Sequence, residues 1–156
     1  TKKDAEFRAD FIDATPQKSR TERTKKAVER AEKLYGRLDA AQLAVIQQRV
    51  DQSSFNARQT YAERLRRQQD TLHTLRPLVA QQAPAAAVQT ALHALRERML
   101  VSPDPAYRAY MEQLEQEACA TFAALHNSTT PAQRHKAVDT LSAYAQDLQA
   151  LVKPAL

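Results

Sequence analysis

The chain has 156 residues, of which one is glycine, one is cysteine and none is tryptophan, and its formal net charge is +5. One glycine leaves no turn for a β-hairpin, one cysteine excludes an internal disulfide, and no apolar run approaches the ~18 residues of a membrane span. The many Ala, Gln, Leu, Arg and Glu residues are strong helix formers, so the sequence predicts a single all-α domain over residues 1–156. We expect a bundle of about six to seven antiparallel helices, either curled or elongated.

The first half of the chain predicts four helices, over about 2–14, 16–35, 38–50 and 53–80. Pro16 separates the first two, because proline keeps the preceding residue extended and suits the first position of the next helix. In the fourth helix, apolar residues follow a heptad spacing with one polar member. This expected seam consists of Tyr61, Leu65, Gln68, Leu72, Leu75 and Val79.

Three more helices are predicted in the second half, over about 83–100, 105–125 and 131–152. Asp104 and Pro105 mark the start of the sixth helix as its cap and first residue. We expect each helix to bury an apolar stripe. The expected stripes are Val88, Leu92, Leu95 and Met99 on the fifth helix, Tyr107, Tyr110 or Met111, Leu114, Ala118, Phe122 and Leu125 on the sixth, and Val138, Leu141, Ala145, Leu148 and Val152 on the seventh.

Two helix starts carry a capping signature. The Thr130 hydroxyl can accept the backbone N–H of Gln133, whose side chain can reach back to the N–H of Thr130. Asp39 and Gln42 have the same spacing at the start of the third helix. The Thr130 capping box stabilises its helix by about 1 kcal/mol, and the Asp39 pair is a weaker version with aspartate in the capping role.

Basic residues concentrate in the first half, which has a net charge of +6 over residues 1–76 against −1 over residues 77–156. Eight of them lie between residues 18 and 37, namely Lys18, Arg20, Arg23, Lys25, Lys26, Arg30, Lys33 and Arg37. They indicate either an ordinary exposed helix or a surface for anionic headgroups or an acidic partner. Nucleic acid is disfavoured, because no aromatic residues alternate with these charges.

A second basic cluster, Arg64, Arg66 and Arg67, lies on the fourth helix. These arginines span more than one face, so at least one is expected to point toward a neighbouring helix. We expect structural ion pairs here, with partner binding as the alternative.

The sequence contains no recognisable catalytic or metal-binding motif. No two of the four histidines form an i, i+4 pair, although His126 and His135 flank one loop and could approach each other. Cys119 is expected to be a small buried hydrophobic residue. We therefore expect no cofactor, no metal and no catalytic residue.

Several stretches together resemble a family of bacterial predicted lipoproteins of unknown function. They are KKAVERAEKLYGRLDAAQLAVIQQRV, YAERLRRQQ, PAYRAYMEQL and LHNSTTPAQRHKAVDTLSAYAQDLQAL, which occur in this order between Phe7 and Leu151. The resemblance implies a periplasm-facing domain. It also implies a signal peptide and a lipidated cysteine ahead of the N-terminus seen here, which would anchor the protein to a membrane.

The elements Leu38–Gln42 and Thr129–Gln133 also resemble paired elements at helix starts in small helical periplasmic stress chaperones. The sequence therefore favours a non-catalytic domain that binds a protein or an envelope partner through helical surfaces. A holdase-like chaperone and an enzyme acting on envelope polymers are the alternatives. Direct contact of the domain with an anionic membrane surface is a further alternative.

Overall fold

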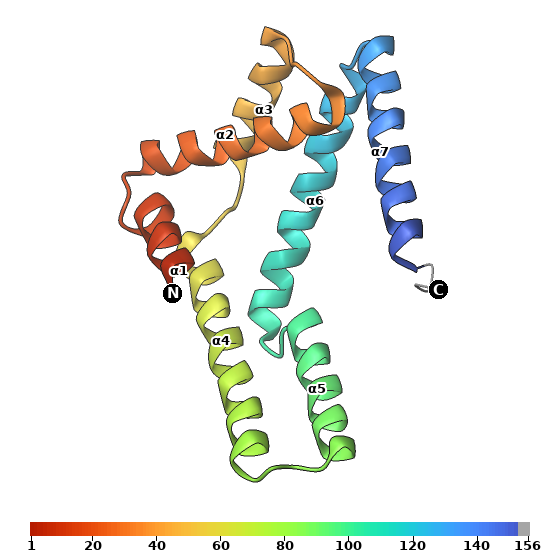
Figure 1. Cartoon of the computed structure of the whole chain (residues 1–156). Coiled ribbons are helices and arrows are strands. Elements are labelled where there is room, and N and C mark those ends of the chain that lie inside the picture. The colour runs from red at the N-terminus through yellow and green to blue at the C-terminus, as the bar shows by residue number, and fades with distance from the viewer. Residues whose placement is uncertain (153–156) are drawn as a thin grey trace. The chain divides into compact units, whose positions relative to one another are not determined.

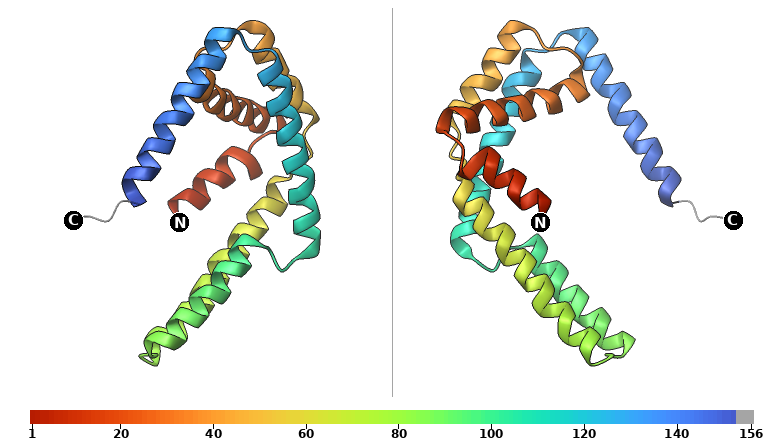
Figure 2. Two further views of the ribbon diagram at one scale, coloured as in Figure 1. Left: turned by 90° about the vertical axis from the view of Figure 1, so that its right-hand side faces the viewer. Right: turned by 60° about the vertical axis from the view of Figure 1, so that its left-hand side comes forward.

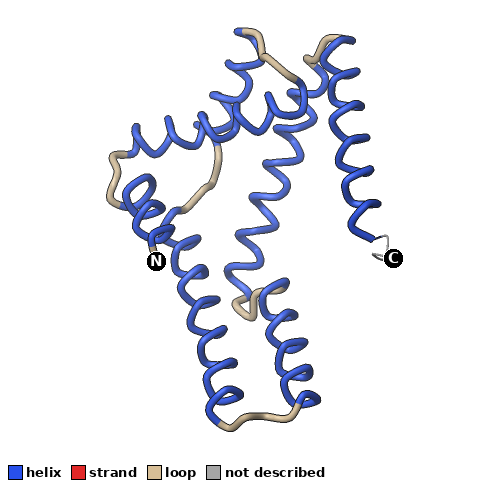
Figure 3. The backbone as a smooth tube through the Cα atoms, in the orientation of Figure 1, coloured by secondary structure: helices blue, strands red, loops and turns tan. Residues whose placement is uncertain are grey.

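A computed structural model describes residues 1–152 as a chain of helices joined by short loops. Among these residues there is no strand, as Figure 3 shows, and the predicted all-α helical bundle is confirmed. The elements, labelled in Figure 1, are α1 (Lys2–Phe7), the π-helical segment η1 (Arg8–Ile12), α2 (Pro16–Tyr35), α3 (Ala40–Gln52), α4 (Ala57–Ala80), α5 (Ala85–Leu100), α6 (Pro105–Asn127) and α7 (Pro131–Val152).

Side-chain caps explain where most of these helices begin. The Thr15 hydroxyl accepts the N–H of Lys18 at 3.2 Å and starts α2. Asn56 accepts the N–H of Gln59 at 3.1 Å and starts α4. Such caps satisfy N–H groups that have no partner inside the helix, so they fix the first turn locally.

Two predicted boundaries were wrong in detail. The first predicted helix divides into α1 and η1, where the backbone hydrogen bond from Asp13 reaches back five residues to Arg8. Helix α4 begins at Ala57 rather than near residue 53. Pro77 lies inside α4 without ending it, and the helix continues to Ala80.

The chain divides into two compact units. Unit 1 contains residues 1–53 and those from 116 onward, and unit 2 contains residues 54–115. Each unit is described by itself below. The single domain expected from chain length stays a prediction.

Unit 1 is built around α2, which packs against α3 and against the first part of α7. Its core consists of Tyr35, Leu38, Ile46, Leu125 and Ala137, all at most 7% exposed. Gly36 joins α2 to the next loop with φ +76° and ψ −163°, a conformation that is available almost only to glycine.

Unit 2 contains the α4–α5 hairpin, whose helices run antiparallel side by side in Figure 1 and in the right view of Figure 2. Leu95 of α5 is buried. At the base of the hairpin, Tyr107 and Tyr110 of α6 are buried with ring centroids 5.8 Å apart. The Tyr110 hydroxyl accepts the backbone N–H of Asn56 at 2.9 Å, which ties α6 to the start of α4.

Several residues predicted to be buried are exposed instead. They are Leu72, Val79, Leu92, Ala118, Phe122, Val138, Leu141, Ala145, Leu148 and Val152. Of the two alternatives on α6, Tyr110 is buried and Met111 is exposed. On α4 the side of the helix that faces α5 differs from the predicted one. Asp70 and Thr74 of α4 accept hydrogen bonds from Arg98, so the side of α4 that carries these two residues faces α5. On α7 the reason is that no described helix covers the predicted stripe.

Candidate functional site

The two predicted capping boxes meet in unit 1 and bind each other. In each box the carboxamide oxygen accepts the N–H of its own N-cap residue, Asp39 or Thr130, at 3.0 Å. The two carboxamides also pair reciprocally: Gln42 donates to Gln133 at 2.8 Å, and Gln133 donates to Gln42 at 2.9 Å. The predicted caps are therefore confirmed, and they are one structure rather than two.

The remaining N–H of each carboxamide binds a loop carbonyl. Gln42 donates to the carbonyl of Ser128 at 3.0 Å, and Gln133 donates to the carbonyl of Arg37 at 3.0 Å. A carboxamide has two donors and two acceptor positions, so both side chains are fully satisfied. Gln42 is 0% exposed. This arrangement positions the loops that precede α3 and α7, and it leaves no free group for chemistry.

Next to this junction, Tyr35 and His126 are joined by a hydrogen bond of 2.8 Å between the tyrosine hydroxyl and Nδ1. The His126 ring stacks on Phe122, with ring centroids 5.9 Å apart. Burial raises the pKa of Tyr35, although the nearby Arg134 opposes the shift. His126 thus has a structural partner, whereas His135 lies near Asp139 at 3.8 Å and is exposed.

The predicted arginine cluster forms ion pairs in unit 2. Glu63 is 5% exposed, and Arg66 donates to its two carboxylate oxygens at 2.7 and 2.9 Å. Arg67 donates at 2.9 Å, and the Ser102 hydroxyl at 3.2 Å. These hydrogen bonds, led by those of Arg66, lower the pKa of Glu63 to about 2 in spite of its burial. The third member of the cluster, Arg64, is half-buried on the same helix.

A second ion pair joins the two helices of the hairpin. Arg98 of α5 donates to both oxygens of Asp70 on α4, at 2.9 Å each. The guanidinium of Arg98 holds the pKa of Asp70 below its usual range. Arg66 also donates to the backbone carbonyl of Arg98 at 3.2 Å. The arginines and carboxylates of this cluster therefore hold α4 against α5.

Four of the eight predicted basic residues share one face of α2. They follow a 3-4-3 spacing that puts them on one side of the helix, and they are Arg23, Lys26, Arg30 and Lys33. Arg37 lies beyond the end of α2, after Gly36. Lys26 pairs with Asp10 at 3.3 Å and lies over the Phe11 ring at 4.5 Å. The other three predicted residues, Lys18, Arg20 and Lys25, are exposed on other parts of α2.

The apolar face of α7 is exposed along most of the helix in unit 1. It consists of Val138, Leu141, Tyr144, Ala145, Leu148, Leu151 and Val152. Every residue from 141 to 152 is exposed, and Leu151 and Val152 are 82% and 83% exposed. The views of Figures 1 and 2 agree that the second half of α7 stands clear of the other helices of its unit.

Side chains that bind metals do not gather at one point in the part of the chain that the structure describes. Residues 1–152 contain no cluster of three or more His, Cys, Asp or Glu side chains that could hold a metal ion. Cys119 was expected to be buried but is exposed on α6, because the buried side of this helix runs through Leu125 instead.

Comparisons with protein-family models, with curated proteins and with solved structures find no match for this chain.

Both capping boxes are recognisable in the sequence, but their contact is not, because Gln42 and Gln133 are 91 residues apart. The apolar stripe of α7 is recognisable as well, but its spacing predicted core and the stripe is exposed. The feature of the sequence that could have indicated an exposed interaction face, rather than core, is the low charge of this segment. Between residues 140 and 152 the only ionisable acid or base that is charged at neutral pH is Asp147.

Proposed function

We propose that this chain is a non-catalytic domain that binds a protein partner through the apolar face of α7. The observation that supports the proposal is the continuous exposure of α7 from Leu141 to Val152. Single exposed apolar residues are normal on a protein surface, whereas a contiguous row of them is typical of an interaction site.

The free energy available from covering this face is substantial. Full burial of one Leu or Val side chain contributes about 1.5–3 kcal/mol relative to leaving it exposed. Leu141, Leu148 and Val152 are each more than half exposed, so a partner could remove much of their surface from water. Their helical spacing suits a partner helix that lies along α7.

The proposed location is the periplasm, with attachment to a membrane as a lipoprotein. This part of the proposal rests on the resemblance of the sequence to predicted lipoproteins. Within residues 1–152, no helix combines the length and the apolar character needed to cross a bilayer. Attachment would therefore depend on a lipid anchor or on surface contacts rather than on these helices.

A holdase-like chaperone is the second candidate. The apolar face of α7 carries little charge. It therefore has few charged groups that could make binding selective among apolar clients. A chaperone of this kind would suppress the aggregation of an unrelated client protein, whereas a domain with one dedicated partner would not.

The test compares two double variants of the full-length protein in affinity capture from envelope extract. Leu141→Asp with Leu148→Asp places two charges on the apolar face. Ala143→Asp with Ala150→Asp places the same charges, at the same spacing, on the opposite side of α7. We expect the first variant to lose the partner that the wild type and the second variant retain.

Equal capture by both variants would contradict the proposed role of α7. The same three proteins, mixed with an aggregating model client, separate the two candidates. Suppression of aggregation by the wild type and by the Ala143/Ala150 variant, but not by the Leu141/Leu148 variant, would favour the chaperone.

A further inference from the structure

A short sequence occurs twice in unit 2, once on each helix of the α4–α5 hairpin. Residues 69–76 read QDTLHTLR and residues 89–96 read QTALHALR, identical at five of eight positions. The shared residues are Gln, Leu, His, Leu and Arg in the same order. The antiparallel packing of the two helices relates the copies by an approximate twofold axis perpendicular to the hairpin.

Both copies turn the same side chains away from the partner helix. On α4 the exposed residues are Gln69, Leu72, His73 and Arg76, and on α5 they are Gln89, Leu92, His93 and Arg96. Each set is spaced i, i+3, i+4, i+7 and so occupies one helical face. The opposite side of α4, at Asp70 and Thr74, contacts α5.

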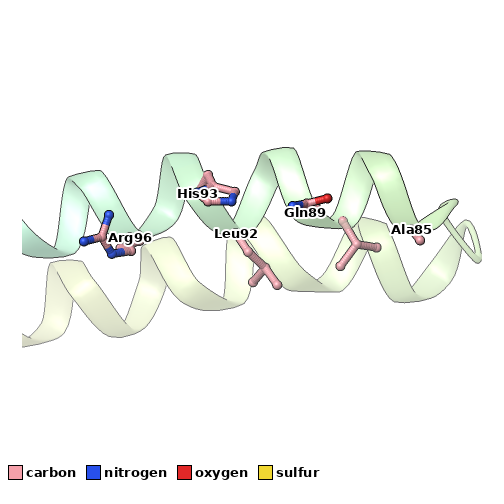
Figure 4. A pocket seen from close by; sticks show the side chains of 6 residues that line it. Ala85, Gln89, Leu92, His93 and Arg96 are labelled. Carbon is pink, nitrogen blue, oxygen red and sulfur yellow. The ribbon is translucent and has the colours of Figure 1, made fainter. Parts of the chain in front are cut away.

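Each repeated face lines a shallow groove. The groove on α5 has a volume of about 440 Å³ and is lined by the repeated residues together with Ala85 and Val88. Figure 4 shows that its labelled side chains all project from α5. The groove on α4 has a volume of about 270 Å³ and includes Pro77 next to the repeated residues.

The Leu-His pairs of the two copies lie at the same height above the tip of the hairpin. His73 lies seven residues before the end of α4, and His93 lies eight residues after the start of α5. With a rise of 1.5 Å per residue, both are roughly 10–12 Å from the ends of their helices. Leu72 and Leu92 accompany them and are 48% and 44% exposed.

The outer half of the hairpin has no acidic residue. Residues 71–96 contain no Asp or Glu, and their formal charges are Arg76 and Arg96. Arg96 also forms an exposed ion pair with the next residue, Glu97, at 2.9 Å. Exposed pairs of this kind are weak, so Arg96 can exchange this carboxylate for another anion. At the tip, Val79 is 77% exposed. A surface that combines exposed apolar side chains with arginines, and has its one neighbouring acid, Glu97, at the inner edge, is complementary to a partner that is both apolar and anionic.

We propose that the outer half of the α4–α5 hairpin docks on the surface of an anionic lipid bilayer. A protein partner would usually contact one edge of a hairpin. A bilayer surrounds an inserted tip, so both outer edges meet the same headgroups, and equivalent Leu, His and Arg side chains at both edges fit this environment. Val79 enters the boundary between headgroups and acyl chains, while the arginines bind lipid phosphates.

This docking is interfacial, because no described helix is suited to cross the membrane. It does not depend on the proposed function of α7, since the hairpin and α7 belong to different units. It is also distinct from the basic face of α2, which the experiment below uses as a control.

The test is flotation of the protein with vesicles of phosphatidylcholine, with and without phosphatidylglycerol. We expect the wild type to float with the vesicles that contain phosphatidylglycerol and not with pure phosphatidylcholine. Arg76→Glu with Arg96→Glu should weaken this binding by about tenfold or more, because each basic residue near the surface contributes to the attraction. Val79→Asp should also weaken it, and its circular dichroism should match that of the wild type because Val79 is exposed.

The matched control is Arg30→Glu with Lys33→Glu, which makes the same change in charge on α2 and should retain binding. The Leu141→Asp/Leu148→Asp variant of α7 should retain it as well. Binding that is lost in the α2 variant and kept in the hairpin variants would overturn the proposal, and so would equal flotation with neutral vesicles.

Two further measurements identify the source of the anion. Soluble glycerol phosphate, at the concentration of the vesicle lipid, should not displace the protein from vesicles. Displacement would mean that the hairpin binds a free phosphate rather than a bilayer. Binding to poly-glutamate, without binding to either kind of vesicle, would mean that the hairpin binds an acidic polypeptide and would likewise overturn the proposal.

Discussion

At the scale of single residues, Gln42 has the most unusual environment in the described chain. It is 0% exposed, yet all four hydrogen-bonding positions of its side chain are filled, two of them by Gln133. Removal of a partner from a buried polar pair leaves the other group unsatisfied, which costs about 1–3 kcal/mol in addition to the lost bonds. The pair therefore contributes to stability only while both members are present.

We predict that Gln42→Ala lowers the free energy of unfolding of unit 1 by about 2–4 kcal/mol, since it removes a helix cap and leaves Gln133 unpaired. Urea unfolding of the full chain measures the loss. The double variant Gln42→Ala with Gln133→Ala should be less destabilised than the sum of the single variants, with a coupling of about 1–2 kcal/mol. Additive losses would show that the two carboxamides do not support each other.

Glu63 gives unit 2 a defined response to acid. Its pKa is lowered from 4.5 to about 2 by Arg66 and the other donors, so the folded state holds the ionised form more strongly than the unfolded state does. The resulting stabilisation is fully present above pH 4.5 and is lost as the pH falls toward 2. A shift of this size corresponds to about 3 kcal/mol.

We predict that stability measured by urea unfolding falls steeply between pH 5 and pH 2, and that Glu63→Gln removes a large part of this fall. Asp70, whose pKa is also lowered, accounts for some of the remainder. At pH 7 the variant should be less stable than the wild type, because Arg66 and Arg67 lose their carboxylate. Glu112→Gln, an exposed carboxylate on α6, is the control and should leave the acid response unchanged.

At the scale of elements, α7 has two different halves. Its first turns pack on α2 and contain the buried Ala137, whereas residues 141–152 are all exposed. A helix of about twelve residues without tertiary contacts is only marginally stable in water. The second half of α7 is therefore held in helical form mainly by its connection to the first half.

We predict that backbone amides in residues 144–152 exchange with deuterium much faster than those in residues 135–139. Leu141→Gln and Leu148→Gln should change the free energy of unfolding by less than about 0.5 kcal/mol, because these side chains are exposed. A loss of 2 kcal/mol or more in either variant would show that the chain itself covers the apolar face of α7.

The sequence predicted the features that depend on neighbouring residues. Thr15 with Pro16, Asp39 with Gln42, and Thr130 with Gln133 each set a helix start within four residues, and all three lie where they were expected. Contacts over longer distances were not predictable in this way. A capping box has the same sequence whether its carboxamide also binds water or a second box 91 residues away.

The apolar stripes show the same limit. A stripe such as Leu141 with Leu148 has the same spacing whether its own chain or another molecule covers it, so burial was predicted where exposure is found. On α4, the spacing of Leu72 and Val79 suggested a seam. The ion pair between Asp70 and Arg98 instead fixed which side of the helix meets α5, and pairing between two helices is not visible in the sequence of one.

At the scale of the whole molecule, the two compact units have separate sources of stability. The Gln42–Gln133 pair belongs to unit 1, and the Glu63 ion pairs belong to unit 2. We predict that thermal unfolding of the full chain, followed residue by residue by NMR, is not a single two-state transition. Gln42→Ala should lower the midpoint mainly for unit 1, and Glu63→Gln mainly for unit 2.

The two variants control for each other. Gln42→Ala should leave the midpoint of unit 2 nearly unchanged, and Glu63→Gln should leave that of unit 1 nearly unchanged. A single midpoint shared by all residues, moved equally by both substitutions, would show that the chain unfolds as one cooperative body.

The two segments of unit 1 come from opposite ends of the described chain, and this has a consequence for biosynthesis. When α3 leaves the ribosome, the carboxamide that completes the environment of Gln42 has not yet been translated. Unit 2 emerges in between and is a continuous segment, so it can acquire its native contacts first. Unit 1 has to wait for closure of a loop of about 90 residues. Until then a chaperone or a translocation channel would encounter an N-terminal region whose helices are formed but whose core is still open.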